Sequence, residues 1–115
     1  MAKLTSHTLN GSDGTHAGGI AVTLRDPGSG TVLLTAEMDA GGRLAANIAA
    51  EKIDPFATYE LVFETGPYWA ARGVTASVQE IALRFAMPDP EGAYHMPVIL
   101  NPNSYSMWIS SCWTG

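Results

Sequence analysis

Hydrophobic and polar residues alternate with a period of two along most of this chain, which is the pattern of strands with one buried face. In residues 4–9 the alternation places Thr5, His7 and Leu9 on one face of the first predicted strand. Gly, Pro, Asp and Asn separate this run from others that are rich in β-branched and aromatic residues. Further strands are predicted at 20–24, 31–38 and 59–63, with one more within 74–85 and two within 91–115.

Turn-forming residues separate the predicted strands and place one cation at a defined point. Residues 10–19 are rich in Gly, Asp, Ser and Thr and are predicted to form a loop. The sequence Asp39-Ala40-Gly41-Gly42 predicts a tight turn directly before Arg43. Residues 44–52 are rich in alanine and could form a helix by propensity, but their neighbours favour a strand followed by a loop.

One short helix interrupts the strand pattern at residues 65–73. Thr65 is suited to the N-cap, Pro67 to the first turn, and Gly73 to the residue that ends the helix. About eight short strands at spacings of about 8–12 residues, with this single helix, predict an all-β antiparallel sandwich.

The composition is that of a folded domain. Hydrophobic residues make up 46% and charged residues 15% of the 115 positions, which excludes a disordered chain. The length predicts one domain spanning residues 1–115. So few charges on so small a chain suggest that partner subunits cover part of its surface. The net charge of −5 argues against nucleic acid or an anionic membrane as the main partner.

The sequence also bears on where the protein works. No apolar run approaches the roughly 20 residues needed to cross a bilayer. The start, MAKLTSHTLNGSDG, lacks the continuous apolar segment of a secretory signal. Cys112 is the only cysteine, so the chain cannot form an internal disulfide. These features predict a cytoplasmic protein.

Three residues combine reactive side chains with strand or turn positions: His7, Arg43 and His95. A histidine can activate water as a general base or donate a proton to a leaving nitrogen. An arginine can hold a carbonyl-rich ring and stabilise a developing oxyanion. These groups suffice to hydrolyse an activated cyclic amide without a metal. Spacing alone does not bring them together, and a histidine in a strand is more often a surface or hydrogen-bonded residue than a catalytic one.

A zinc site is the alternative use of the histidines, with His7, His16 and His95 as ligands. None of them forms a close His-x-His or His-x-x-x-His pair, which argues against a metal. His16 lies in a glycine-rich loop and is expected to be solvated.

The last predicted strand carries a second group of candidates. Alternation places Ser106, Trp108, Ser110 and Cys112 on one of its faces. Cys112 could act as a nucleophile activated by a histidine, or remain a passive thiol beside a cavity.

Six segments of the chain read LTSHTLN, GIAVTL, AGGR, YELVFETGPYW, EIALRF and YHMPVILNP, the last followed by SYS. In order and spacing they resemble the transthyretin-like family, in particular the 5-hydroxyisourate hydrolases of purine catabolism. Members of that family have a histidine in the first strand, an arginine after an acidic-Gly turn, and a Tyr-His-x-Pro strand. Here these features fall on His7, Arg43 and His95.

The resemblance implies a homotetramer of β-sandwiches, a dimer of dimers with active sites at the mouths of a central channel. It also implies that His7, Arg43 and His95 meet there with the closing strand. Water activated by histidine would attack a ring carbonyl of 5-hydroxyisourate and open the ring to 2-oxo-4-hydroxy-4-carboxy-5-ureidoimidazoline. The arginine would bind the substrate and steady the oxyanion, and no cofactor or metal would be needed.

The chain departs from this family at its end. The hydrolases usually finish in Tyr-Arg-Gly-Ser, whereas the matching positions here are Trp108-Ile109-Ser110-Ser111, followed by Cys112 and three more residues. Ile109 in place of arginine removes the guanidinium N–H donors. Trp108, Ser110, Ser111 and Cys112 are therefore expected to line the substrate pocket in an altered form. Hydrolysis of 5-hydroxyisourate is the leading expectation. The alternatives are another cyclic or heteroaromatic substrate, or non-catalytic binding of a small molecule.

Overall fold

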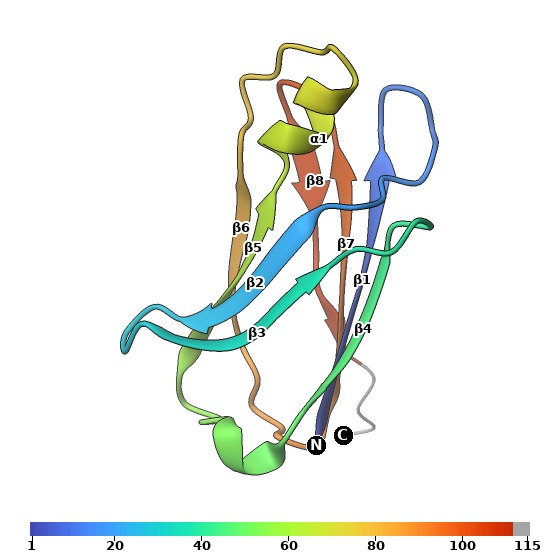
Figure 1. Ribbon diagram of the computed structural model, residues 1–115. Helices are drawn as coiled ribbons and strands as arrows, with labels where there is room; N and C mark the ends of the chain where they lie inside the picture. Colours follow the sequence, from blue (N-terminus) through green and yellow to red (C-terminus); the bar gives the residue numbers. More distant parts are fainter. Residues whose placement is uncertain (112–115) are drawn as a thin grey trace.

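A computed structural model of the protein describes residues 1–111. Its strands form two sheets that face each other as the layers of a sandwich (Figure 1). The predicted all-β sandwich with one short helix is confirmed. Within the described residues, no helix is long and apolar enough to cross a bilayer.

The first sheet, called sheet A, has the strand order β4-β1-β7-β8, and the short β9 also pairs with β7. Its central pair, β1 and β7, is parallel, whereas its other pairs are antiparallel. The period-two pattern did not predict this parallel pair. The bounds are β1 (Ala2–Asn10), β4 (Arg43–Ile48), β7 (Ala93–Leu100), β8 (Tyr105–Met107) and β9 (Ser110–Ser111).

The second sheet, called sheet B, has the order β3-β2-β5-β6, and all of its pairs are antiparallel. A 3-10 helix, η1, follows β4, so the alanine-rich segment does form a strand and then a loop, as its neighbours indicate. The bounds are β2 (Ala21–Asp26), β3 (Thr31–Glu37), β5 (Thr58–Glu64), β6 (Ile81–Ala86) and η1 (Ala50–Lys52).

The predicted helix is α1 (Gly66–Ala71), which lies at one end of the sandwich (Figure 1). Gly73 follows it with a φ of 70°, a conformation that glycine adopts without strain. Thr65 occupies the N-cap, as predicted, although its side chain makes no capping hydrogen bond. Its hydroxyl is buried without a partner among the described residues.

The core lies between the two sheets and fixes which face of each strand turns outward. In β1 the buried positions alternate with half-buried ones, so Leu4, Ser6 and Thr8 point inward. The two inward hydroxyls are satisfied, because Ser6 Oγ donates to the Met96 carbonyl and Thr8 Oγ1 to the Ala17 carbonyl, both at 2.6 Å. The largest fully buried side chains come from both sheets and the helix: Trp69, Tyr94, Phe63, Leu4, Leu24 and Leu61.

The closing strand is divided in two, which differs from the single strand that the sequence predicts. The register stays constant across the gap, since Val98 pairs with Met107 before it and His95 with Ser110 after it. By that register Pro97 stands at the gap. Proline has no N–H to donate to a ladder, so the pairing lapses between β8 and β9.

Candidate active site

The outer face of sheet A gathers the predicted site residues from three neighbouring strands. His7 of β1 pairs directly with Arg43 of β4. On the other side of β1, Thr5 pairs with His95 of β7. Directly opposite residues on one face of a sheet have Cβ atoms about 5 Å apart. The sheet therefore brings together the histidines and the arginine that the sequence left unconnected.

Arg43 is presented by the turn between β3 and β4. The carboxylate of Asp39 accepts hydrogen bonds from the backbone N–H groups of Gly41 and Arg43, both at 2.9 Å. Gly42 has a φ of 71°, and a Cβ there would stand 2.5 Å from the Thr8 carbonyl oxygen. The turn thus requires glycine at this position. It delivers Arg43 as the first residue of β4, as predicted.

The guanidinium of Arg43 has no ionic partner in the described part of the chain. No carboxylate among residues 1–111 lies within ion-pair distance of it. The side chain is exposed on the open face of the sheet. A cation in this state is available to an anionic or carbonyl-bearing ligand.

His95 is oriented by a hydroxyl on the neighbouring strand. Its Nδ1 lies 2.8 Å from Oγ1 of Thr5, and the ring is half-buried. Within residues 1–111, Nε2 of the same ring has no hydrogen-bond partner. One nitrogen of His95 is therefore held by the protein while the other is left for a ligand or water.

His7 is paired with a residue that the sequence had placed in solvent. Its Nε2 lies 2.8 Å from Nδ1 of His16, and the two rings stack with centroids 4.9 Å apart. Burial is the main cause that lowers the pKa of His7, followed by the positive charges of Arg43 and His16; a hydrogen bond to the backbone of Gly41 opposes them. His7 thus favours the neutral form.

The closing strand reaches this site through a single described side chain. Ser110 pairs with His95, whereas the backbone of Ser111 pairs with Tyr94. Trp108 precedes β9 and its side chain is 48% exposed. Cys112 lies outside the described residues. Of the four predicted pocket residues, Ser110 is the one placed directly opposite a histidine.

The comparisons with known proteins identify the family of the chain. A model of the HIUase/Transthyretin family matches residues 4–109. The chain belongs to the HIUase/Transthyretin family. A Pseudomonas aeruginosa relative named 5-hydroxyisourate hydrolase is 31% identical over 117 residues, which cover 96% of this chain and 93% of that protein.

Solved structures with this family's fold superpose closely on the chain. Klebsiella pneumoniae 5-hydroxyisourate hydrolase matches with a TM-score of 0.80 and 27% identity, covering 96% of this chain and 99% of that one. Transthyretin from Sparus aurata matches with a TM-score of 0.81 and 27% identity, covering 96% and 97% of the two chains. The family match includes His7, Arg43 and His95 and stops at residue 109, within the altered end of the chain that begins at Trp108.

The sequence did not predict the side-chain contacts that two residues make with His7 and His95. Thr5 shares the outward face with His7, but only the parallel pairing of β1 with β7 shows that it contacts His95. His16 is exposed, as expected, yet it hydrogen-bonds His7. Among the residues that the structure describes, no three His, Cys, Asp or Glu side chains are grouped to hold a metal ion.

Proposed function

We propose that this protein hydrolyses 5-hydroxyisourate, with His95 and Arg43 as the principal catalytic residues. The observation that carries the proposal is that the two strands flanking β1 place two available groups on one sheet face. Among residues 1–111, His95 on β7 has no hydrogen-bond partner at Nε2, and Arg43 on β4 has no acidic partner. Relatives that carry the hydrolase name align with nearly the whole chain, which supports the same activity here.

His95 is the general base in this proposal. If its Nδ1 carries the hydrogen, that N–H donates to Thr5 Oγ1 and leaves the lone pair on Nε2. Nε2 then takes a proton from water as the water oxygen attacks a ring carbonyl. The C–N bond of the ring breaks, and the protonated His95 returns the proton to the leaving nitrogen. The sequence did not distinguish the two histidines, and the free Nε2 favours His95.

Arg43 supplies the positive charge. A tetrahedral intermediate carries a negative charge on the former carbonyl oxygen, and a fixed cationic donor stabilises it. Because Arg43 has no carboxylate partner in the described chain, its N–H groups are not diverted into a structural ion pair. No cofactor takes part in these steps.

His7 contributes by staying uncharged. A positive charge on His7 would repel the charges of Arg43 and His95, and this repulsion contributes to the lowered pKa of His7. A proton on His7 would in turn oppose the proton that His95 must accept. Neutral His7 therefore places no positive charge beside the imidazolium that forms on His95 during the reaction.

The proposal includes assembly as a homotetramer in the cytoplasm. Sheet A presents the half-buried His7 and His95 on its outer face, so a second subunit could close the site and exclude water. Exposed apolar side chains at the end of the same sheet, Tyr105, Trp108 and Ile109, suit a subunit interface. Size-exclusion chromatography with light scattering tests the tetramer.

The activity is tested by following the ultraviolet decay of freshly generated 5-hydroxyisourate. Micromolar protein is expected to accelerate the decay over buffer, and His95→Ala to lower kcat/KM by about 10²–10⁴. Lys3→Ala, an exposed change on the neighbouring strand β1, is the control and retains activity. Decay no faster than in buffer would overturn the proposed function, and a fully active His95→Ala variant would overturn the mechanism.

A second candidate is a related enzyme for a different flat ring. The exposed indole of Trp108 stands by register opposite Pro97, two residues from His95. Its large flat surface could stack on a heteroaromatic substrate. The double variant Trp108→Tyr, Ile109→Arg distinguishes the two candidates. If it hydrolyses 5-hydroxyisourate faster than the parent, that result favours a different substrate for the natural chain.

A further inference from the structure

We infer that His16 is a positioning residue of this site, whose Nδ1–H donates to Nε2 of His7 and holds that ring as the neutral tautomer protonated on Nδ1. The inference rests on the proposed hydrolysis for its functional meaning. It rests on contacts within the described chain for its geometry, and the sequence had offered His16 only as a possible zinc ligand.

The first step is the direction of the hydrogen bond. The 2.8 Å contact joins Nε2 of His7 to Nδ1 of His16, so one of these nitrogens donates and the other accepts. His7 also hydrogen-bonds the backbone of Gly41, in the sense that raises the pKa of His7, so the Gly41 carbonyl accepts a ring N–H. With Nε2 facing His16, Nδ1 is the nitrogen left for Gly41. His7 therefore accepts at Nε2, and His16 donates.

The second step is that the loop fixes His16 in place. The backbone of His16 forms an isolated β-bridge with Leu9. On either side, the Asn10 N–H donates to the Thr15 carbonyl at 2.8 Å and the Ala17 N–H to the Thr8 carbonyl at 2.9 Å. His16 is thus held beside β1 by main-chain hydrogen bonds, although its side chain is exposed.

The third step concerns charge. If both rings were imidazolium, Nε2 of His7 and Nδ1 of His16 would each carry a hydrogen aimed at the other, and the contact could not form. The other charged or titratable groups that act on His7 are Arg43 from β4 and His95 from β7, and both disfavour its protonation. His16 adds a donor that stabilises neutral His7, and neutral His7 leaves His95 free to accept a proton.

The direct test observes His7 without any substrate. Long-range ¹H–¹⁵N spectra of the labelled full-length protein report which ring nitrogen carries the hydrogen, and a pH titration gives the pKa. We expect neutral His7 to be protonated on Nδ1, with a pKa below the ordinary value. His16→Ala should raise this pKa and mix the tautomers, while Ser12→Ala, an exposed change in the same loop, should leave both unchanged.

His16→Asn is the conservative variant, because its amide nitrogen can take the place of Nδ1 as a donor without adding a titrating charge. It should keep the His7 tautomer of the parent. An unchanged tautomer and pKa in His16→Ala would overturn the inference, as would mixed tautomers in the parent.

The kinetic test uses the pH profile of kcat/KM. In His16→Ala the acid limb should move to higher pH, by up to about one unit, which costs about tenfold in activity on that limb. The plateau at higher pH should be nearly that of the parent. A uniform loss at every pH would mean that His16 only supports the loop and would overturn the inference. If no variant hydrolyses the substrate, the proposed function fails while the spectroscopic result still decides the role of His16.

Discussion

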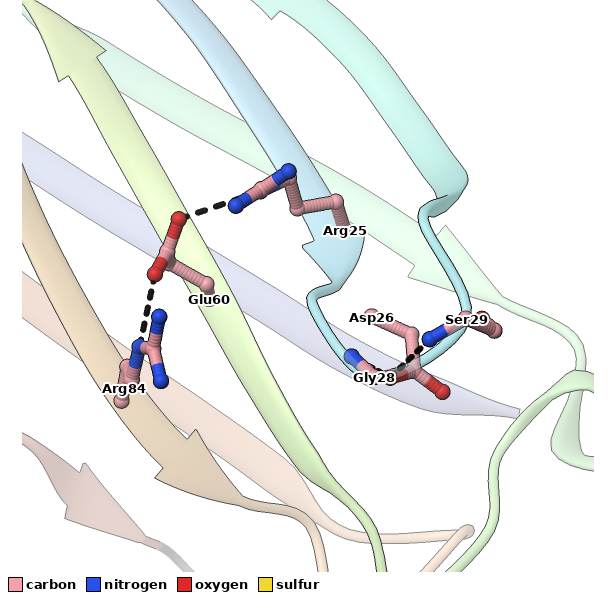
Figure 2. A network of polar contacts seen from close by, with 6 residues as sticks. All are labelled: Arg25, Asp26, Gly28, Ser29, Glu60 and Arg84. Atoms are coloured by element: carbon pink, nitrogen blue, oxygen red, sulfur yellow. Dashed lines mark hydrogen bonds and ion pairs between the residues drawn. The ribbon is translucent and has the colours of Figure 1, made fainter.

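The outer faces of the two sheets use charged side chains in opposite ways. On sheet B, the carboxylate of Glu60 receives hydrogen bonds from Nε of Arg84 at 2.8 Å and Nε of Arg25 at 3.1 Å (Figure 2). These contacts, that of Arg84 first, hold the pKa of Glu60 below its ordinary value. On sheet A, Arg43 has no such acid among residues 1–111 and stands beside His7 instead.

The difference separates a structural cation from one that can bind a ligand. Arg25 and Arg84 cross from the neighbouring strands to a shared carboxylate on β5 and tie three strands of sheet B together (Figure 2). Arg43 makes no comparable cross-strand ion pair in the described chain. Removing the charge of Arg43 should therefore lower activity, whereas removing the charge of Arg84 should lower stability.

The largest expected contrast is between Arg43→Gln and Arg84→Gln. Arg43→Gln removes the charge proposed to stabilise the oxyanion and should lower kcat/KM by about 10²–10³ with little change in Tm. Arg84→Gln should leave kcat/KM within a factor of about two and lower Tm instead. Steady-state hydrolysis and thermal unfolding of both variants measure the contrast. Equal losses of activity would show that the two faces do not differ in this way.

Glu60→Gln should have the next largest effect, and on stability alone. The Glu60 side chain is 10% exposed, but its partners are 41% and 64% exposed, which weakens the ion pairs through solvent screening. We expect the free energy of unfolding to fall by about 1–2 kcal/mol at pH 7. Denaturant unfolding gives this value, and hydrolysis should be unchanged.

The pH dependence of this effect follows from the direction of the pKa shift. The folded-state pKa of Glu60 lies below the ordinary glutamate value of 4.5, so its stabilisation is fully present above that value. It is lost as the pH falls through the folded-state pKa. The parent and Glu60→Gln should therefore converge in stability at low pH. A difference that persists there would mean that the lost stability is not electrostatic.

Thr5→Val should have the smallest effect, on activity alone. Valine keeps the shape of threonine but removes the hydroxyl that holds Nδ1 of His95. A hydrogen bond of this kind contributes about 0.5–1.5 kcal/mol, so kcat/KM should fall by up to about tenfold. Thr23→Val, on the half-buried outer side of sheet B, is the matched control. A loss of the same size in Thr23→Val would show that the effect does not come from His95.

The sequence predicted the side of a strand on which a residue lies, and the position of a turn, better than it predicted which residues contact each other. Alternation placed His7 on an outward face, and the Asp39–Gly42 turn located Arg43, because both depend on neighbours in the chain. It could not show that Thr5 contacts His95, since a period of two does not say which strand pairs with which. His16 was also out of reach, because its position depends on how the loop hydrogen-bonds to β1.

The closing strand shows the same limit. The sequence predicted one strand with alternating faces, and the register does continue across it. Pro97 interrupts the ladder from the neighbouring strand, so the interruption is not visible in the residues of the closing strand itself. The prediction that Ser110 lies on the side of the histidines stays consistent with the structure because the register is kept.

The parallel pairing of β1 with β7 also sets when the site can form. The contact between Thr5 and His95 spans 90 residues of chain, with both strands of sheet B's central pair and the helix in between. Contacts at such separation form late and slowly, because the intervening loop must lose its entropy before any pairing is gained. On the ribosome, β1 can pair with β4 along one edge, but its other edge stays unpaired until β7 has emerged. A chain that ends before β7 would therefore lack His95 and its contact with Thr5, so the site would be completed only when sheet A is completed.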